Sequence, residues 1–550
     1  MSDHAMTIFI ANIGRKLKVY KSTIVFVLLF SVFAAFYYDS VLEKPPMFIH
    51  MWRQTDCLSL TKMYQEGASF FSPEVHYQGA DDLNSGKSAG EFPLLYYLVG
   101  KLWNILGESY LVYRLFYLLI LFTGQLALFK ALKLLLKSDF WSVLLALLFF
   151  TSPVYAFYGV SFLTDIPAFS LSVIALYFLL RYHLEGSQKT FVWSMVFFTL
   201  AGLLKISSLI PFVFLSFILF IESLGVKTLG DRKVFTRPKL EWPGFLSVLA
   251  IVLLWYSYGS YYNSVHGFKY TFNSIFPASE YSQEFLSHLF DQISGNMIIS
   301  AHNPILLYIV SAMVLANIVL FRRLNLFAYL ANILVLLGAL IYFLLWLPIF
   351  ENHDYYYTPF FNLQFSSVLP FFFVIKGWIS HKKRRSLVRI LSMFFLLYSF
   401  LYCWGIMQMR RGNEVSMPFL YARSYVDYGN WLFWHSGRYL RFERIRPYLK
   451  ELGIKEEDKI ISMPDPSFNA SLYLSGHKGW TNFWGALSVY FHGVGNSENM
   501  WQAVDHGARY LLVSEGDKLR DPFLEDFTRD KIGEFEGIQV FRLPSRKGLN

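Results

Sequence analysis

Cysteine and charge are both scarce in this chain. Only two of the 550 residues are cysteines, Cys57 and Cys403, and 16% are charged, against roughly 25% in an ordinary soluble protein. Two cysteines exclude a disulfide framework and a cysteine-rich metal site, although one bridge stays open if both face an oxidising compartment. The low charge excludes a soluble globular enzyme. A hydrophobic content of 55%, with a mean hydropathy of +0.37, excludes disorder.

Motifs for nucleotide chemistry are missing as well. The chain has no Walker loop and no glycine-rich dinucleotide fingerprint in its proper context, which argues against a nucleotide-sugar or ATP-driven enzyme. Aromatic residues, by contrast, make up 19% of the chain. Such rings suit bilayer interfaces and contacts with sugars or lipids.

Long apolar runs recur from near residue 22 to near residue 406. A helix that spans a bilayer needs about 20 mostly apolar residues, so each run predicts one crossing. The runs predict a polytopic α-helical membrane protein with about eleven transmembrane helices, near residues 22–39, 110–129, 140–158, 163–181, 190–205, 207–222, 243–262, 302–321, 326–348, 357–376 and 387–406.

The positions of lysine and arginine explain the net charge of +10. Every second connection between the runs is basic, which by the positive-inside rule places the N-terminus in the cytoplasm. Nucleic-acid binding therefore gains no support from the charge. The basic connections contain Arg15, Lys16, Lys18, Lys21, Lys130, Lys133, Lys137, Arg181, Lys189, Lys227, Arg232, Lys233, Arg237, Lys239, Arg322, Arg323, Lys382, Lys383, Arg384 and Arg385.

The chain divides into a transmembrane part and an external tail. No small-residue cleavage site follows the first run in FAAFYYDSVLEKPP, so we expect a retained helix rather than a signal peptide. Residues 1–406 form the predicted transmembrane catalytic domain, with a first external loop at about 40–109 that contains amphipathic helices. Residues 407–550 are more polar and predict a small soluble α/β or α+β domain on the same external side.

Three acids are candidates for chemistry because this topology places them on the same side of the bilayer. Asp56 lies in a short amphipathic segment of the first loop, where an acid at the bilayer surface acts either as a general base or merely as a helix cap. Glu91 precedes a proline where the chain returns to the membrane. Asp165, in SFLTDIPAFS, has the features of a helix start, so capping explains it without catalysis.

Two further positions stand out at the same membrane edge. Lys205 interrupts the apolar run 190–222, and if the run is a helical hairpin this lysine marks its external turn and holds a phosphate; the alternative is a side chain that extends to the interface. His353, in FENHDYYYTPF, is one half of a His-Asp pair of the kind that can ligate a divalent cation, although interfacial tyrosines are expected there in any case.

The first loop resembles a known family. An external acid soon after the first helix, a glycine, then GEFPLLYY and a later Gly-Arg combination (Asp56, Gly67, Gly107 and Arg114) are similar to the GT-C superfamily, and most to the protein O-mannosyltransferases and lipid A aminoarabinose transferases of glycosyltransferase families 39 and 83. The resemblance covers about residues 45–215, and HDYYYTP is similar to a late loop of bacterial members.

The resemblance implies roles for individual residues. Asp56 is the implied general base and Asp165 matches a second important acid. The family lysine that contacts the lipid phosphate is replaced by Phe92, so the phosphate needs other cations. The candidates are Arg53, Lys87, Arg114, Lys205 and His353. In the aminoarabinose transferases a glutamate and a distant histidine bind a metal, which implies a divalent ion at Glu91 with His353 or His266.

The resemblance also implies a function and a location. A bacterial inner-membrane enzyme of this kind moves a sugar, with inversion, from a polyprenyl-phosphate (undecaprenyl-phosphate) donor to a lipopolysaccharide, glycan, lipid or protein acceptor on the periplasmic face. A lipid-linked sugar transporter or flippase and a lipid-pyrophosphate oligosaccharide ligase or polymerase are the alternatives. In the tail, SLYLSGHKGWTNFWG is rich in residue types that stack on sugars, and packing of the domain explains it as well. Its candidate residues are His477, Lys478, Trp480 and Trp484.

Overall fold

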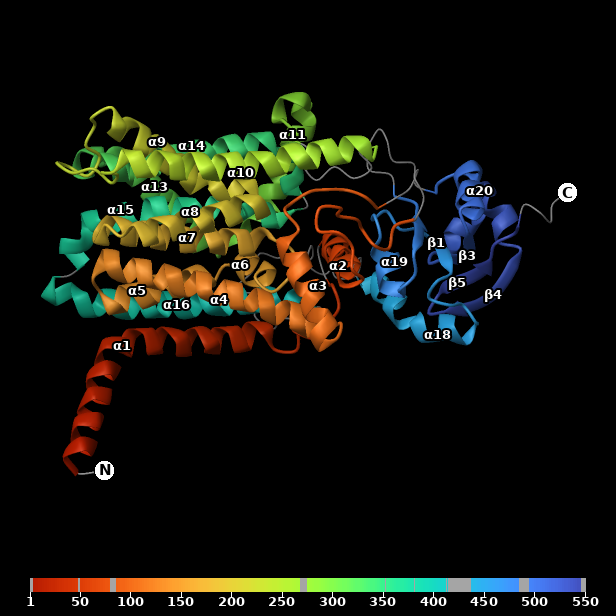
Figure 1. The fold of residues 1–550 in the computed structure, drawn as a ribbon, viewed down its shortest axis with the longest axis horizontal. Coiled ribbons are helices and arrows are strands. Elements are labelled where there is room, and N and C mark those ends of the chain that lie inside the picture. Colours follow the sequence, from red (N-terminus) through yellow and green to blue (C-terminus); the bar gives the residue numbers. More distant parts are fainter. Residues whose placement is uncertain are drawn as a thin grey trace.

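A bundle of long helices carries a small sheet domain at one end (Figure 1). The computed structural model describes residues 3–47, 50–79, 86–267, 275–351, 353–379, 381–411, 413, 437–483 and 494–545. The helices before the sheet domain are α1 (Asp3–Tyr38), α2 (Met51–Gln65), α3 (Leu94–Leu106), α4 (Tyr110–Leu136), α5 (Asp139–Phe150), α6 (Pro153–Tyr158), α7 (Asp165–Glu185), α8 (Gln188–Leu204), α9 (Ile210–Ser223), α10 (Pro238–Val265), α11 (Gln283–Gln292), α12 (Ile298–Ala301), α13 (Pro304–Val319), α14 (Leu326–Leu345), α15 (Phe361–Ile379) and α16 (Lys382–Met409).

Each apolar run of the sequence forms helix. Among the described residues, eight helical segments are long and apolar enough to cross a membrane: Tyr20–Tyr38, Tyr110–Leu136, Asp165–Glu185, Ile206–Ser223, Pro238–Val265, Leu326–Leu345, Asp354–Ile379 and Lys383–Met409. A bent pair, Gln283–Ala301 with Pro304–Val319, makes a ninth. The other two predicted runs form the shorter apolar helices α5 and α8. The multi-pass architecture is confirmed, and the count of eleven spans stays a prediction.

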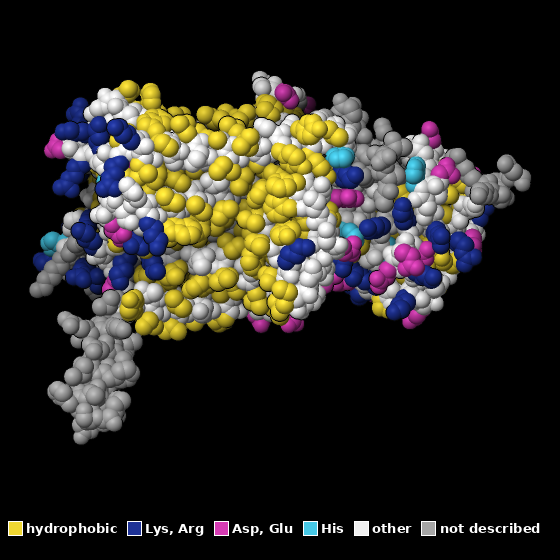
Figure 2. Space-filling view, viewed as in Figure 1, with side chains coloured by type: hydrophobic (Ala, Val, Ile, Leu, Met, Phe, Trp, Pro, Cys, Tyr) yellow, Lys and Arg dark blue, Asp and Glu magenta, His cyan; other side chains and the backbone are white. Residues whose placement is uncertain are grey.

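The surface divides into zones along the bundle. Hydrophobic side chains cover its flank, and lysine and arginine gather at the end opposite the sheet domain (Figure 2). That end is where α4 and α7 finish and where α5, α8 and α16 begin, as the alternating basic connections predict. The bundle interior is packed with aromatic rings. For example, the rings of Phe26 and Phe129 stack at 4.7 Å and join α1 to α4.

The two cysteines do not pair with each other. Cys57 on α2 and Cys403 on α16 are both free thiols and both fully buried. Cys57 lies against the hydroxyl of Tyr96, with 3.3 Å between Sγ and Oη. The bridge that the sequence left open is therefore absent, because each cysteine fills a place in a packed interior.

The sheet domain is a five-stranded mixed sheet with strand order β2-β1-β3-β5-β4. Strands β2, β1 and β3 run parallel to one another, and β5 runs antiparallel to both of its neighbours, β3 and β4. Apolar residues such as Ile461, Leu511 and Val540 are buried in it. Its elements are β1 (Lys459–Met463), β2 (Gly479–Thr481), β3 (Ala508–Val513), β4 (Asp530–Phe535), β5 (Ile538–Arg542), α18 (Arg446–Glu451), α19 (Ala470–Ser475) and α20 (Ser497–Asp505).

The sheet domain docks on the first loop of the bundle. The segment at Gln78 pairs in parallel with Gly479 on β2, and the Gly479 amide donates to the Tyr77 carbonyl at 3.1 Å. Gly79 packs against Trp480 so closely that a Cβ would lie 2.5 Å from the indole. The loop therefore continues the edge of the sheet, and α2 lies between the bundle and α19 (Figure 1).

A buried ion pair lies at this end of the bundle. Arg410, just after α16, binds Asp354, and both side chains are buried. We expect Arg410→Met to leave the buried Asp354 carboxylate without its cation and to lower the free energy of unfolding by about 3–5 kcal/mol. Thermal unfolding of the purified protein in detergent measures the loss. The matched control is Arg181→Met, which breaks the exposed pair with Glu185 and should cost less than about 1 kcal/mol. Equal losses in the two variants would contradict this account.

Candidate active site

Asp56 lies on α2, at the junction between the bundle and the sheet domain. Its side chain is fully buried, and Oδ1 accepts a hydrogen bond from the Asn469 side chain of the sheet domain. Because α2 begins at Met51, Asp56 lies in the second turn rather than at the helix start. Capping, the bland alternative from the sequence, is therefore wrong for Asp56.

The surroundings of α2 also differ from the prediction. Leu58, Leu60, Met63 and Tyr64 are buried, as are the polar residues on the other faces of the helix between Gln54 and Thr61. The helix is covered by α3 on one side and by α19 on another. The helix α2 is therefore an internal element rather than an amphipathic helix on the membrane surface, and Asp56 is surrounded by protein.

Glu91 forms the centre of a second group of charges. Its carboxylate accepts hydrogen bonds from the Arg53 guanidinium and the Tyr96 hydroxyl. Burial by itself raises the pKa of Glu91, but Arg53, Tyr96 and the nearby Lys205 outweigh it, and the pKa lies below its usual value. Glu91 is therefore a stable anion that fixes Arg53, which lies three residues before Asp56 on the same face of α2.

Asp165 and Lys205 form an ion pair at 3.0 Å. Asp165 is the first residue of α7, whose N-cap residue Thr164 makes no side-chain cap. Lys205 lies in extended backbone between α8 and the short 3₁₀ turn η1 (Ile206–Leu209) that precedes α9. The run 190–222 is thus the helical hairpin that the sequence predicted, with Lys205 at its turn. Burial lowers the pKa of Lys205, yet Asp165, Tyr356 and Glu91 outweigh it and raise the pKa, so the ammonium stays charged.

The HDYYYTP segment lies beside Lys205. It folds as the 3₁₀ turn η6 (Asp354–Phe360), and the Lys205 ammonium lies 4.8 Å from the ring centre of Tyr356 and 5.5 Å from that of Tyr355. The ring of His353 stacks on His50 at 4.4 Å. Burial lowers the pKa of His353 to about 4, so this histidine is neutral at pH 7. His353 therefore adds no positive charge to this group of residues.

The predicted cations divide into two groups. Arg53 and Lys205 both lie close enough to Glu91 to lower its pKa, whereas Arg114 and Lys87 are placed differently. Arg114 donates to the backbone carbonyls of Val160 and Lys44, both at 2.9 Å, and its guanidinium covers the Phe162 ring. It therefore joins loops instead of facing a ligand. Lys87 pairs through its backbone with Glu74 in the first loop.

The residues at which the resemblance implies a metal have other partners in the structure. Among the described residues, no group of three His, Cys, Asp or Glu side chains is placed to hold a metal ion. The Glu91 carboxylate is bound to a guanidinium, His353 stacks on another imidazole, and His266 packs on Tyr262 at the end of α10.

Phe92, where the resemblance leads one to expect a lysine, is an aromatic packing residue. Its ring packs against Phe70 at 5.1 Å and Trp255 at 4.9 Å, and its amide donates to the Leu203 carbonyl at 2.9 Å. This contact brings the Glu91 loop beside the end of α8, and so beside Lys205. Glu91 and Lys205 therefore lie near each other at this end of the bundle.

In its described part, the aromatic segment of the tail, SLYLSGHKGWTNFWG, packs within the sheet domain. Trp480 is buried in the core of the sheet domain, and His477 is buried with Nδ1 against the Ser475 carbonyl. Lys478 precedes β2, and its backbone carbonyl accepts a hydrogen bond from the Ile460 amide. Trp484 lies outside the described residues. Asn469 and Tyr96 are the site residues that sequence reasoning missed, and no local pattern marks either of them.

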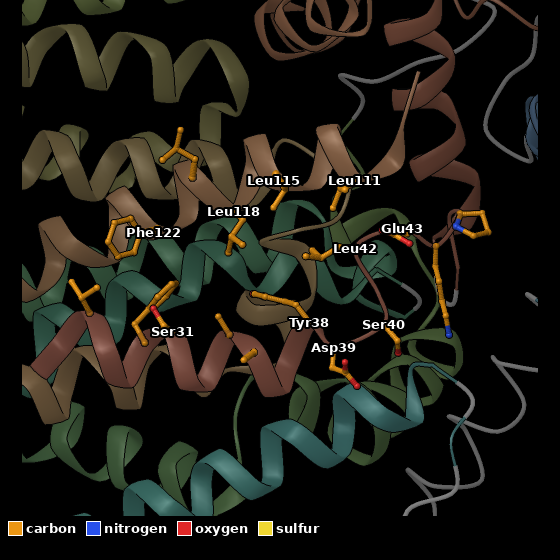
Figure 3. Close-up of a pocket in the computed structure, with 17 residues that line it drawn as sticks. Ser31, Tyr38, Asp39, Ser40, Leu42, Glu43, Leu111, Leu115, Leu118 and Phe122 are labelled. Atoms are coloured by element: carbon orange, nitrogen blue, oxygen red, sulfur yellow. The ribbon is translucent and has the colours of Figure 1, made fainter. Parts of the chain in front are cut away.

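An open apolar groove of about 1120 Å³ runs along the bundle between α1 and α4 (Figure 3). Leu111, Leu115, Leu118 and Phe122 line one side of it, and Asp39, Glu43 and Lys44 add polar groups at one end. A groove of this composition suits a lipid chain, with its polar part toward the membrane surface.

Comparisons with known proteins identify the fold. The sequence model of the dolichyl-phosphate-mannose-protein mannosyltransferase family matches residues 90–258. No curated protein matches by sequence. The chain is similar in structure to ArnT from Cupriavidus metallidurans in the apo state, with a TM-score of 0.57 and 12% identity over 96% of this chain and 98% of ArnT. Against ArnT bound to undecaprenyl phosphate the TM-score is 0.54, with 12% identity over 95% and 98%.

The fold is therefore the GT-C fold that ArnT has, as the first loop indicated. The similarity to ArnT runs through nearly the whole of both chains, so it includes the sheet domain as well as the bundle.

The ion pair at the hairpin turn is open to a direct test. Asp165→Asn removes the largest influence that raises the pKa of Lys205, so burial should lower that pKa. A drop of one unit exposes roughly tenfold more neutral amine at a given pH below the pKa. Lys205, 27% exposed, should then react faster with an amine-acylating reagent, measured by mass spectrometry.

Two controls accompany this measurement. Lys455, which is 73% exposed, should react equally in both proteins. Asp139→Asn removes the acid beside Lys133 at the other end of the bundle and should leave the Lys205 rate unchanged. An unchanged Lys205 rate in Asp165→Asn would show that the pair does not set its protonation.

Proposed function

We propose that the protein is a membrane glycosyltransferase that moves a sugar, with inversion, from a polyprenyl-phosphate donor to an acceptor of the cell envelope. The observation that carries this proposal is a buried acid, Asp56, on the same helix face as Arg53 and at the same end of a GT-C fold as the Lys205 ammonium. A transferase of this kind needs a base for the acceptor and a fixed cation for the departing phosphate.

The chemistry is a single displacement at the anomeric carbon. Asp56 takes the proton of the acceptor hydroxyl or amine as the acceptor attacks. The bond from the anomeric carbon to the phosphate oxygen breaks, and its electron pair leaves on the lipid phosphate. Lys205 and Arg53 stabilise that negative charge, since Asp165 and Glu91 hold both cations in place at no cost of reorganisation during the reaction.

The donor class follows from two observations. ArnT from Cupriavidus metallidurans, which shares the fold, has been solved with undecaprenyl phosphate bound. This chain also presents cations at the membrane edge and an apolar groove along α1 and α4 that suits an isoprenoid tail. A lipid monophosphate that carries one sugar combines both features, so we assign it as the donor.

The orientation follows from the charge pattern. The end of the bundle that is rich in lysine and arginine faces the cytoplasm by the positive-inside rule, so the site and the sheet domain face the opposite compartment (Figure 2). In a bacterial inner membrane this compartment is the periplasm, where glycans, lipids and proteins of the envelope are all accessible as acceptors.

The first experiment gives the protein in nanodiscs a panel of radiolabelled polyprenyl-phosphate sugars and an envelope extract. Wild type should transfer one sugar to the extract, and Asp56→Asn should lose about 10²–10⁴-fold in rate because the base is gone. Asp517→Asn, at an exposed acid of the sheet domain, is the matched control and should match wild type.

Two outcomes would reject the transferase. If wild type transfers no sugar from any donor, the proposal fails. If instead the donor crosses liposomes and Asp56→Asn transports as wild type does, the protein is a transporter of lipid-linked sugar.

Lys205 tests the phosphate cradle separately from the base. Lys205→Gln removes the charge beside the donor phosphate, so the apparent KM for the polyprenyl-phosphate sugar should rise by about tenfold or more. Inhibition by free undecaprenyl phosphate should weaken in parallel. Lys133→Gln, which removes the lysine of an ion pair at the other end of the bundle, is the control. A Lys205→Gln enzyme with wild-type KM would show that the phosphate binds elsewhere.

A further inference from the structure

Asn469 is the residue through which the sheet domain reaches Asp56. Its side chain is fully buried, and Nδ2 donates to Asp56 Oδ1. A carboxylate only accepts hydrogen bonds, so this contact fixes the amide with its NH₂ group toward the acid. The other end of the amide, Oδ1, is buried and accepts no hydrogen bond from any described residue.

The loop that carries Asn469 is held rigidly. Asp465 accepts hydrogen bonds from the backbone amides of Ser467 at 2.8 Å and Ser471 at 2.9 Å. The Thr481 hydroxyl binds the Ser467 carbonyl at 2.8 Å, and Gln78 of the first loop binds the Phe468 carbonyl. This network fixes the residues on both sides of Asn469, so its amide is positioned before any ligand arrives.

A buried amide oxygen without a donor lowers stability, so such a group in a native structure calls for an explanation such as strain, a catalytic role or a bound partner. Here the oxygen belongs to the side chain that touches the proposed base. In an inverting displacement the base lies on the acceptor side of the sugar, opposite the departing phosphate. Asn469 is therefore on the acceptor side, and the cations Lys205 and Arg53 serve the donor.

We propose that Asn469 Oδ1 accepts a hydrogen bond from the acceptor, from an O–H or N–H group next to the group that Asp56 deprotonates; this rests on the proposed function. The reacting proton goes to Asp56, so Oδ1 needs a second donor close by. Neighbouring hydroxyls of a sugar ring supply two such donors, whereas a serine or threonine side chain supplies one. A peptide would have to supply its second donor from the flexible backbone N–H, whereas the sugar ring holds both hydroxyls at a fixed spacing. We therefore assign the acceptor class as a glycan or a sugar-bearing lipid, with Asn469 as a specificity residue contributed by the sheet domain.

The test compares kinetics for the two substrates in the full-length protein in nanodiscs, with the donor found by the transfer assay. The acceptor probes are purified lipopolysaccharide and a threonine-containing peptide. Asn469→Leu should raise the apparent KM for lipopolysaccharide about tenfold, the loss of one buried hydrogen bond, and leave the KM for the donor within about twofold. The peptide should be a poor acceptor for wild type.

Two variants separate binding from folding. Asn469→Asp keeps an oxygen at this position, so its KM for lipopolysaccharide should stay within about threefold of wild type while kcat falls, because a second carboxylate faces Asp56. Asn496→Ala removes an amide that caps α20 in the same domain and should leave both KM values unchanged.

The outcomes distinguish this inference from the proposed function. Wild type without any transfer rejects the proposed function and this inference with it. Wild-type transfer combined with an unchanged acceptor KM in Asn469→Leu, or with efficient transfer to the threonine peptide, overturns the inference alone. If the leucine variant does not fold, Asn469→Asp against Asn496→Ala still decides, since an acceptor KM raised tenfold in the aspartate variant overturns it.

Discussion

The ion pair of Asp165 with Lys205 is the contact on which the arrangement of the site depends. It joins the start of α7 to the turn between α8 and α9, and it keeps an ammonium charged at the edge of an apolar bundle. An isolated charge beside apolar surroundings costs free energy, so a cation at this position needs a buried acid beside it. The same rule explains Arg53 with Glu91, and Arg410 with Asp354. Each pair ties together two segments that are far apart in the sequence.

The bilayer accounts for why all of these groups meet at one end. Backbone polar groups inside a membrane have to be satisfied within helices, so the spans are long, apolar and poor in functional groups. Polar chemistry is left to the connections, and alternating connections share one side of the membrane. The sheet domain then covers that side. It pairs with the first loop at Gln78 and Gly479, and it places Asn469 on Asp56, so the site is enclosed by two parts of the chain and neither one completes it alone.

Two residues singled out by the family resemblance make contacts that the resemblance did not predict. Phe92 packs into an aromatic cluster, and the hairpin turn beside it carries the Lys205 ammonium. Arg114 donates its hydrogen bonds to backbone carbonyls. Residue type at a matching position is therefore a weak guide to contact, because a cation's partners depend on which loops the fold brings beside it.

The sequence by itself determined the helical runs and their alternating basic connections, and it predicted one shared side for Asp56, Glu91, Asp165 and Lys205, since hydropathy and charge act locally and leave a direct pattern in the chain. It also marked Lys205 as the turn of a hairpin. It could not separate a capping role from a catalytic one for Asp56, because that depends on where α2 begins. Only the tertiary structure decided that Arg53 belongs to Glu91 and that Asn469, 413 positions further along the chain, binds Asp56, since contacts between distant segments arise from packing and leave no periodic trace in the sequence.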